Sequence, residues 1–140
     1  MKVHHIGYLV KNIEKSADAF RALGFEDTSF SDEFMTNDTI RGCVICFLKN
    51  ENTVVELVSP NTEDSPIRGL MKTYKNTPYH LCYESDDIEK DMAELKKKGF
   101  MVFLKPEEAP AIAGCRVVFL TNPRIGIVEI AYRENSLEKS

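Results

Sequence analysis

The sequence lacks the long apolar runs and the excess of basic residues that mark membrane-spanning and nucleic-acid-binding proteins. No apolar stretch approaches the roughly 18 residues that read as a membrane span. Asp and Glu outnumber Lys and Arg by 22 to 18, whereas contacts to nucleic-acid phosphates need clustered basic residues. The N-terminus shows no cationic segment followed by an apolar run and a cleavage site. We therefore expect a cytoplasmic protein that binds neither a membrane nor a nucleic acid.

Cysteine is also scarce, with four residues at spacings that suggest no disulfide framework. Cys43 and Cys46 form a C-x-x-C pair, but they lie within an apolar run typical of a β-strand. Because residues three apart on a strand point to opposite faces, these two thiols are poorly placed to share a metal. We interpret them as small apolar core residues.

What the sequence does contain is an internal repeat at an offset of 75 residues. Each copy starts with a short β-type run that carries a histidine, continues with a capped amphipathic helix and ends that helix at a glycine. The matching pairs are His5 and His80, Asn12 and Asp87, Ile13 and Ile88, and Gly24 and Gly99. Self-similarity at a fixed offset indicates a duplicated unit. A chain of 140 residues suits one compact domain built from two such modules, so we treat 1–140 as a single domain.

Each module is predicted to have the order βαβββ, which makes the domain α+β. Module one covers about 3–58, with strands near 3–10, 26–31, 40–48 and 53–58 and a helix near 13–23. Module two covers about 78–132, with strands near 78–84, 100–104, 115–121 and 126–132 and a helix near 87–98. The connection, 59–77, contains a short helix that opens at Ser65-Pro66 and buries Ile67, Leu70 and Met71. Residues 105–114 form a predicted loop that could cover a site.

Strand alternation sorts the first strands into two faces. His4, Ile6, Tyr8 and Val10 are predicted to pack on a helix, which leaves His5, Gly7 and Leu9 on the opposite face. In the second copy Tyr79, Leu81 and Tyr83 are predicted to pack on a helix, which leaves His80, Cys82 and Glu84 opposite. One histidine from each module, His5 and His80, is therefore expected to face away from the helices.

Two glutamates occupy equivalent places in the last strand of each module. Glu56 lies within Val54-Val55-Glu56-Leu57-Val58, and Glu129 lies within Ile127-Val128-Glu129-Ile130-Ala131. A lone carboxylate among aliphatic residues must meet a positive group or water, because burying an isolated charge costs several kcal/mol or more.

Taken singly, each of these histidines could be a structural residue and each glutamate could face solvent. The repeat makes a shared role more persuasive, because pseudo-twofold pairing would bring His5, Glu56, His80 and Glu129 together. Two imidazoles and two carboxylates suit a first-row divalent metal, and the two negative charges balance the ion.

On these residues the chain resembles the vicinal oxygen chelate superfamily, which includes the glyoxalases and the bleomycin resistance proteins. The segments His5-Ile6-Gly7, Glu56-Leu57, His80-Leu81 and Val128-Glu129-Ile130 match the four ligand positions of the family, and the resemblance covers about 3–132. It implies a cupped mixed sheet of two βαβββ modules, one divalent ion per site (nickel, cobalt or zinc) and a homodimer.

Two branches of the superfamily are similar to this sequence: the methylmalonyl-CoA epimerases and the compact bacterial glyoxalase I enzymes. Epimerases carry a carboxylate in the strand near 40–48, whereas Gly42-Cys43-Val44-Ile45-Cys46-Phe47 has none. They also tend to have a longer glycine-rich turn before the last ligand strand than Asn122-Pro123-Arg124-Ile125-Gly126. Both differences favour the glyoxalase I branch.

The resemblance to glyoxalase I implies a lyase that converts the hemithioacetal of a 2-oxoaldehyde and a thiol into an S-2-hydroxyacyl thiol through an enediolate. Glu129 would be the base and Glu56 its symmetry partner, and residues 105–116 would contact the thiol. The first alternative is a methylmalonyl-CoA epimerase, for which Arg41, Lys105, Arg116 and Arg124 are candidate contacts to CoA phosphates. The second is a non-catalytic small-molecule binding protein of the same superfamily.

Overall fold

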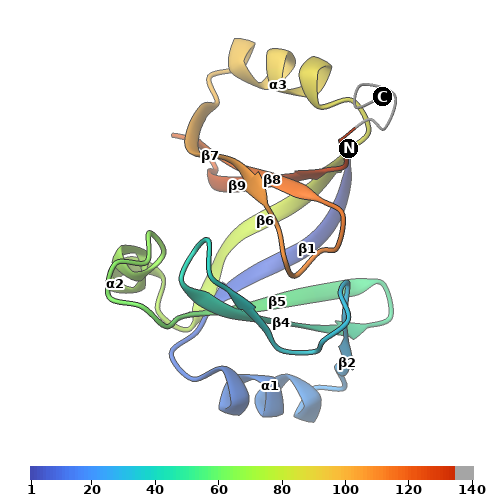
Figure 1. Ribbon diagram of the computed structural model, residues 1–140, viewed down its shortest axis with the longest axis vertical. Helices are drawn as coiled ribbons and strands as arrows, with labels where there is room; N and C mark the ends of the chain where they lie inside the picture. The colour runs from blue at the N-terminus through green and yellow to red at the C-terminus, as the bar shows by residue number, and fades with distance from the viewer. Residues whose placement is uncertain (135–140) are drawn as a thin grey trace.

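A computed structural model describes residues 1–134, which form one mixed sheet with two long helices on its outer side (Figure 1). The strands are β1 (Lys2–Leu9), β2 (Glu26–Thr28), β3 (Thr36–Asp38), β4 (Cys43–Asn50), β5 (Thr53–Pro60), β6 (Thr77–Ser85), β7 (Met101–Glu108), β8 (Arg116–Asn122) and β9 (Gly126–Tyr132). The helices are α1 (Ile13–Ala22), the 3-10 turn η1 (Arg68–Leu70), α2 (Met71–Tyr74) and α3 (Ile88–Lys97). The predicted α+β class is confirmed.

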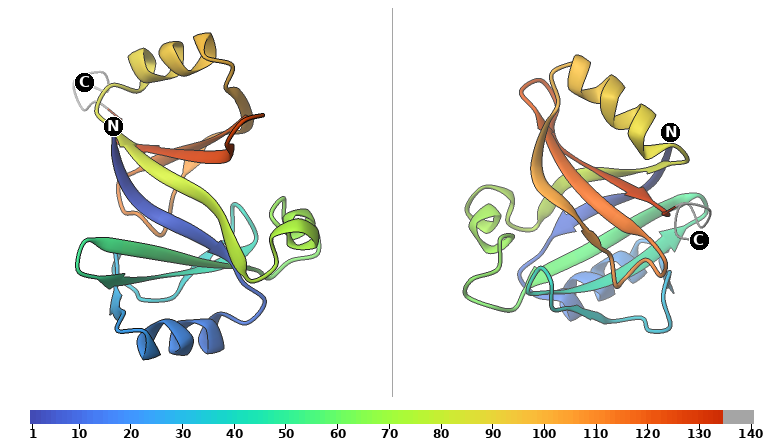
Figure 2. Two further views of the ribbon diagram at one scale, coloured as in Figure 1. Left: turned by 180° about the vertical axis from the view of Figure 1, so that it is seen from behind. Right: turned by 45° about the horizontal axis from the view of Figure 1, so that its top comes forward.

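The sheet is symmetric about its two central strands. Its order is β2-β4-β5-β1-β6-β9-β8-β7, with β3 paired to β4. β1 and β6, the equivalent first strands of the modules, pair antiparallel, and each pairs in parallel with the last strand of its own module, β5 or β9. The sheet bends at β1 and β6, so that the two halves face each other while α1 and α3 lie outside (Figures 1 and 2).

The helix boundaries follow from their caps. The Asn12 side chain accepts a hydrogen bond from the backbone N–H of Lys15 (2.9 Å), and Asp87 accepts one from Lys90 (3.2 Å). Gly24 and Gly99 follow the two helix ends at φ of 97° and 89°, the left-handed region that favours glycine. The N-cap residues and the glycines of the predicted repeat therefore begin and end the helix in the same way in both modules.

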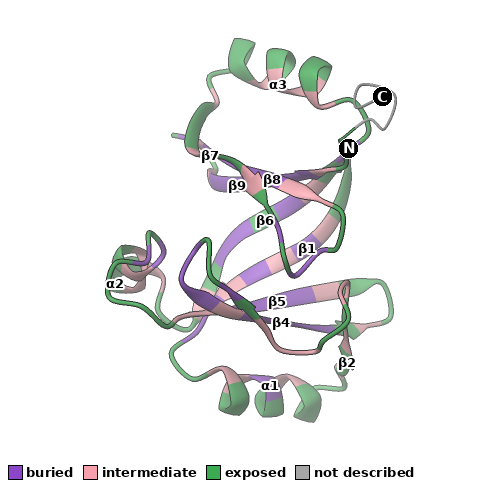
Figure 3. Ribbon diagram, in the orientation of Figure 1, coloured by how far each residue is buried: buried purple, intermediate pink, exposed green. Residues whose placement is uncertain are grey.

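Three hydrophobic clusters divide the interior (Figure 3). One lies between α1 and its half of the sheet, and a second lies between α3 and the other half. The third fills the concave side and includes Leu9, Phe47 and Phe119. It also includes Ile67 from the connection, whose N–H donates to the Ser65 hydroxyl. The short helix predicted to open at Ser65-Pro66 begins later, at Arg68, and its cap residue Ile67 makes no side-chain capping hydrogen bond. Leu70 and Met71, predicted to be buried, are only partly buried.

Several boundaries differ from those predicted. β3 was not predicted, because Thr36-Asn37-Asp38 is polar and is held as an edge strand by pairing with β4. The predicted strand at 26–31 extends only over Glu26–Thr28. β7 continues to Glu108 through Pro106, so the predicted loop at 105–114 is shortened from its N-terminal end. Pro106 is tolerated because β7 is the edge of the sheet and its register shifts between Leu104 and Glu107. Among the described residues, no helix is long and apolar enough to cross a membrane.

The four cysteines are free thiols, and three of them are buried. Cys43 belongs to the concave cluster and Cys46 to the α1 cluster, so they do lie on opposite faces of β4. Burial raises the pKa of Cys46 to about 12 and raises the pKa values of Cys43 and Cys82 further.

We expect a disulfide reagent such as DTNB to modify Cys115 first in the native protein, and the other three only on unfolding. Two or more rapidly reacting thiols, or a fast phase that persists in Cys115→Ser, would contradict this.

Candidate metal centre and active site

Four donor side chains converge on one point of the concave side. His5, Glu56, His80 and Glu129 each offer one atom, and these atoms all lie within 4.8 Å of one another. The Nε2 of His5 is 3.2 Å from the Nε2 of His80. The same His5 nitrogen lies 3.1 Å from Oε1 of Glu129 and 3.4 Å from Oε1 of Glu56. The four residues predicted from the repeat therefore meet in the fold.

The register of the central strands explains this convergence. His5 and His80 lie on neighbouring antiparallel strands, in which Gly7 pairs with His80 and His5 with Cys82. Glu56 is the partner of Gly7 on β5, and Glu129 is the partner of Cys82 on β9. The pseudo-twofold axis passes between β1 and β6, so each module contributes one imidazole and one carboxylate.

Two residues lie on the face opposite to the one predicted. His4 stacks on Phe30, with ring centroids 4.4 Å apart, and Tyr79 belongs to the concave cluster. Both stand where the β1–β6 register shifts, between Val3 and His5 and opposite the Gly7/Tyr8 shift. A β-bulge lets consecutive side chains share a face, which simple alternation does not anticipate. The bulges are themselves related by the repeat, because Tyr79 is the equivalent of His4.

Of the other residues predicted to pack on a helix, some do so and some do not. Tyr8 packs on Phe20 of α1, and Tyr83 joins the α3 cluster, as predicted. Leu81 is 38% exposed and belongs to none of the three hydrophobic clusters. Of the three β6 residues predicted to pack on a helix, only Tyr83 does so.

Burial and charge act against each other on the donors. Burial alone would lower the pKa of His5, but the Glu56 charge and hydrogen bonds to Cys82, Glu129 and Glu56 raise that pKa well above its ordinary value. Burial alone would raise the pKa of Glu129, but its contacts with His5 and His80 lower it. Burial and the two carboxylates raise the pKa of Tyr79. Glu129 is thus held as a carboxylate by the histidines that face it.

The Nδ1 atoms of the two histidines, His5 and His80, have different surroundings. Nδ1 of His5 lies 2.7 Å from Nδ1 of His4, whereas Nδ1 of His80 is buried with no partner among the described residues. The His80 ring lies against the backbone of Gly7. A Cβ atom at Gly7 would be 2.6 Å from Nε2 of His80 and closer still to Cε1 and Nδ1. Gly7 therefore provides the space that the His80 ring occupies.

A small cavity of about 20 Å³ adjoins two of the four donors, Glu56 and Glu129. Its wall includes both glutamates, Tyr79 and the pair Asp38 and Arg41, which sequence reasoning did not place at the site. Arg41 Nη1 donates to Oδ2 of Asp38 (2.7 Å) and to the Glu108 carbonyl (2.9 Å). Asp38 also accepts from the N–H groups of Ile40 and Arg41. The D-x-x-R spacing was the available signal. Because Arg41 is buried in this pair, it is a poor candidate for contacts to exposed CoA phosphates.

The residues present fit a divalent metal ion. A tetrahedral ion with bonds of about 2.0–2.1 Å spaces its donors about 3.3 Å apart. The separations from the histidine Nε2 atoms to each other and to the carboxylate Oε1 atoms are 3.1–3.7 Å. Oε1 of Glu129 is buried and faces the Nε2 atoms of His5 (3.1 Å) and His80 (3.2 Å), the atoms with which it would share a metal ion. Ion size, donor type and charge therefore agree.

The protein therefore consists of two βαβββ modules around a centre of two histidines and two glutamates that is suited to bind a metal ion. The family model of the Glyoxalase/Bleomycin resistance protein/Dioxygenase superfamily matches residues 4–119. The chain belongs to this superfamily.

Relatives and solved structures agree with this assignment. An ethylmalonyl-CoA/methylmalonyl-CoA epimerase from Cereibacter sphaeroides is 31% identical over 121 residues, covering 85% of this chain and 87% of that protein. The mitochondrial methylmalonyl-CoA epimerase of Mus musculus is 30% identical over 121 residues, covering 85% of this chain and 65% of that protein. A variant of Streptomyces coelicolor methylmalonyl-CoA epimerase in complex with 2-nitronate-propionyl-CoA matches with a TM-score of 0.75 and 20% identity, over 96% of this chain and 99% of that one. This last likeness supports the fold alone.

Proposed function

We propose that this protein is an epimerase that inverts the C2 centre of a 2-carboxyacyl-CoA thioester of the methylmalonyl-CoA type. The similarity to the ethylmalonyl-CoA/methylmalonyl-CoA epimerase over most of both chains supports the substrate class. The observation that carries the reaction class is the pair of carboxylates, Glu56 and Glu129, which reach one centre from opposite modules. Inversion through a planar intermediate needs a proton carrier on each face, and this pair supplies two.

The pair also compensates for the missing strand carboxylate. Residues 43–50 contain no acidic side chain, and Asp38, which lines the cavity together with the two glutamates, already accepts three hydrogen bonds. These hydrogen bonds tie the Asp38 carboxylate to Ile40 and Arg41, so it is not free to move toward a substrate carbon. Glu56 therefore takes the second role, which makes the two proton carriers symmetry-equivalent.

The proton steps balance between these two groups. Glu129, held ionised by its histidine contacts, removes the C2 proton and leaves an enolate in which C2 is planar. Glu56 delivers a proton to the opposite face of C2, so this mechanism requires that one of the two carboxyl groups carries a proton at the start of each turnover. After turnover the two carboxyl groups have exchanged states, which is the starting arrangement for the reverse reaction.

His5 and His80, together with the two glutamates, would hold a divalent ion such as nickel, cobalt or zinc. When bound, the ion would supply Lewis-acid stabilisation of the charge that develops on the thioester oxygen. Val58, Val117 and Ile112 form a buried aliphatic part of the cavity wall, which helps to exclude water from that charge.

The substrate requires a movement of the cavity wall. A space of about 20 Å³ holds little more than one water molecule. Ala109, Ala111 and Ile112, from the segment between β7 and β8, form one side of it. These residues fall within the range predicted to contact the thiol, and we place the entry of the acyl group there.

The sequence favoured the glyoxalase I interpretation, but the relatives described above do not support it. They support the epimerase alternative. The glyoxalase I interpretation rested on the missing strand carboxylate and on the short turn at residues 122–126, and a second glutamate at the metal centre answers the first of these two objections. The non-catalytic alternative is disfavoured by the intact four-donor set. The homodimer and the absence of nucleic acid as a partner stay predictions.

The test is exchange and inversion at C2 in D₂O. Protein stripped of metal and reloaded with cobalt, nickel or zinc is incubated with one stereoisomer of methylmalonyl-CoA. Deuterium at C2 is followed by mass spectrometry, and configuration by a stereospecific coupled enzyme. We expect metal-dependent inversion together with deuterium incorporation.

The control uses the methylglyoxal–glutathione hemithioacetal with the same preparations. Formation of its thioester, monitored by absorbance, without inversion of methylmalonyl-CoA would overturn the proposal in favour of the lyase. Loss of both activities in protein that binds metal would move the assignment to another acyl substrate or to a binding role.

A further inference from the structure

We propose that His4 is a positioning residue of the metal site, whose Nδ1 accepts a hydrogen bond from Nδ1 of His5 and thereby aims Nε2 of His5 at the other three donors. The two Nδ1 atoms are 2.7 Å apart, a hydrogen-bond distance that requires one nitrogen to donate and the other to accept. The inference rests on the metal site of the proposed function.

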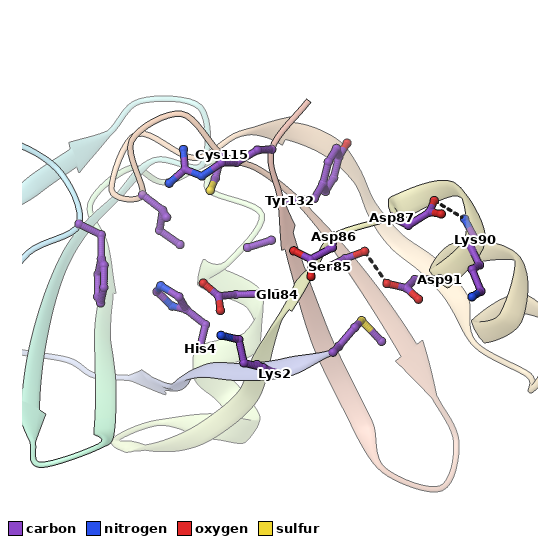
Figure 4. A pocket seen from close by; sticks show the side chains of 15 residues that line it. Lys2, His4, Glu84, Ser85, Asp86, Asp87, Lys90, Asp91, Cys115 and Tyr132 are labelled. Carbon is purple, nitrogen blue, oxygen red and sulfur yellow. Dashed lines mark hydrogen bonds between the residues drawn. The ribbon is translucent and has the colours of Figure 1, made fainter. Parts of the chain in front are cut away.

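The direction of this hydrogen bond follows from the role of His5. A histidine that binds a metal through Nε2 carries its proton on Nδ1, so Nδ1 of His5 must donate. Nδ1 of His4 is then the acceptor, and the His4 proton sits on Nε2. His4 lines a groove of about 960 Å³ together with Lys2 and Glu84 (Figure 4). Because His4 is only half-buried beside this groove, its Nε2–H needs no protein acceptor.

The position of His4 is fixed by backbone and packing. The β1 bulge turns its side chain toward the concave face, where the ring is tilted on Phe30 (4.4 Å) and lies edge-on to Phe47 (6.1 Å). Phe47 is also in edge contact with the ring of His5 (5.3 Å). The two imidazoles therefore share one aromatic support, and the acceptor nitrogen has little freedom to leave its place.

The repeat provides an internal comparison. Tyr79 occupies the same bulge in module two, packed edge-on against His80 with centroids 4.4 Å apart. Nδ1 of His80 has no partner among the described residues. The two histidine ligands are thus inequivalent: His5 is oriented by an acceptor, and His80 by packing over Gly7.

Two variants separate the acceptor role of His4 from its packing role. His4→Phe keeps an aromatic ring against Phe30 and Phe47 but removes the acceptor. His4→Asn loses the ring but keeps an acceptor, because Oδ1 of Asn and Nδ1 of His are both bonded to Cγ. An orienting partner of a metal ligand is worth about 10–100-fold in metal affinity, so we expect His4→Phe to weaken zinc binding by that factor and His4→Asn to retain most of it.

Zinc affinity is measured by competition with a chromogenic chelator, without substrate, so the result is independent of the epimerase assay. Thermal unfolding of the metal-free variants checks that each one folds. Equal affinity in all three proteins, or a larger loss in His4→Asn than in His4→Phe, would overturn the proposal. Long-range ¹H–¹⁵N spectra of the zinc-loaded wild type provide a test that needs no variant. We expect the His4 proton on Nε2, and a proton on its Nδ1 would overturn the assignment.

Discussion

Replacing Glu129 by glutamine is expected to lower the interconversion of methylmalonyl-CoA stereoisomers by about 10²–10⁴-fold, the usual contribution of a positioned general base. Glutamine keeps the shape of the side chain and an oxygen that can serve as a ligand, but it cannot take up the C2 proton. Because Glu129 is buried between His5 and His80, no neighbouring water can readily replace it as base. Turnover is compared at saturating metal, with metal content measured in each preparation.

The matched control is Glu56→Gln, the same change at the equivalent position of module one. With one proton carrier removed, the remaining glutamate can still exchange the C2 proton of the one stereoisomer that faces it. Each variant should therefore incorporate deuterium from D₂O into one stereoisomer without inverting it, and the two variants should act on opposite stereoisomers. Full turnover in metal-loaded Glu129→Gln would falsify the assignment of the base. Exchange of the same stereoisomer by both variants would contradict the two-face arrangement.

The candidate site could be predicted from the sequence because the internal duplication repeats the donor residues at equivalent positions of both modules. A single histidine in a strand says little, but His5 and His80 at one offset, with Glu56 and Glu129 closing their modules, identified the donor set that the fold brings together. Helix boundaries were equally accessible, since Asn12 and Gly24, and Asp87 and Gly99, are local signals whose physical effect does not depend on distant packing.

Features that depend on pairing between distant strands could not be predicted from the sequence. The bulges that turn His4 and Tyr79 inward arise from the β1–β6 register, which alternation within one strand cannot reveal. The polar strand Thr36–Asp38 exists because β4 offers an edge to it. The Arg41 contact with the Glu108 carbonyl joins segments 67 residues apart, so the role of this residue emerged only from the fold.

Replacing Gly7 by alanine is expected to dismantle the metal site. The new methyl group would overlap Nε2, Cε1 and Nδ1 of His80, with the backbone of β1 on one side and the packed rings of Tyr79 and Phe119 on the other. The imidazole must therefore leave its position, since the β1 backbone is held by pairing to both β5 and β6. Overpacking of this kind costs about 1–3 kcal/mol of folding stability. Because a whole ligand is displaced, we expect zinc affinity to fall by about 100-fold or more, the upper limit for changes that only disturb a ligand's partner.

The chain offers a control for the added methyl group itself. Gly69 lies in η1, and a Cβ atom there would have no heavy atom within 4 Å apart from its chain neighbours and the backbone of its own helix. Gly69→Ala should leave zinc affinity and the unfolding midpoint close to those of the wild type. Calorimetric titration with zinc and thermal unfolding of the metal-free proteins measure the two quantities. If Gly7→Ala bound zinc as tightly as Gly69→Ala, His80 would have to be either mobile enough to yield or not a ligand at all. Cobalt spectra of the two variants would then distinguish these cases, because loss of an imidazole ligand changes the visible absorption and a small shift of the same ligand does not.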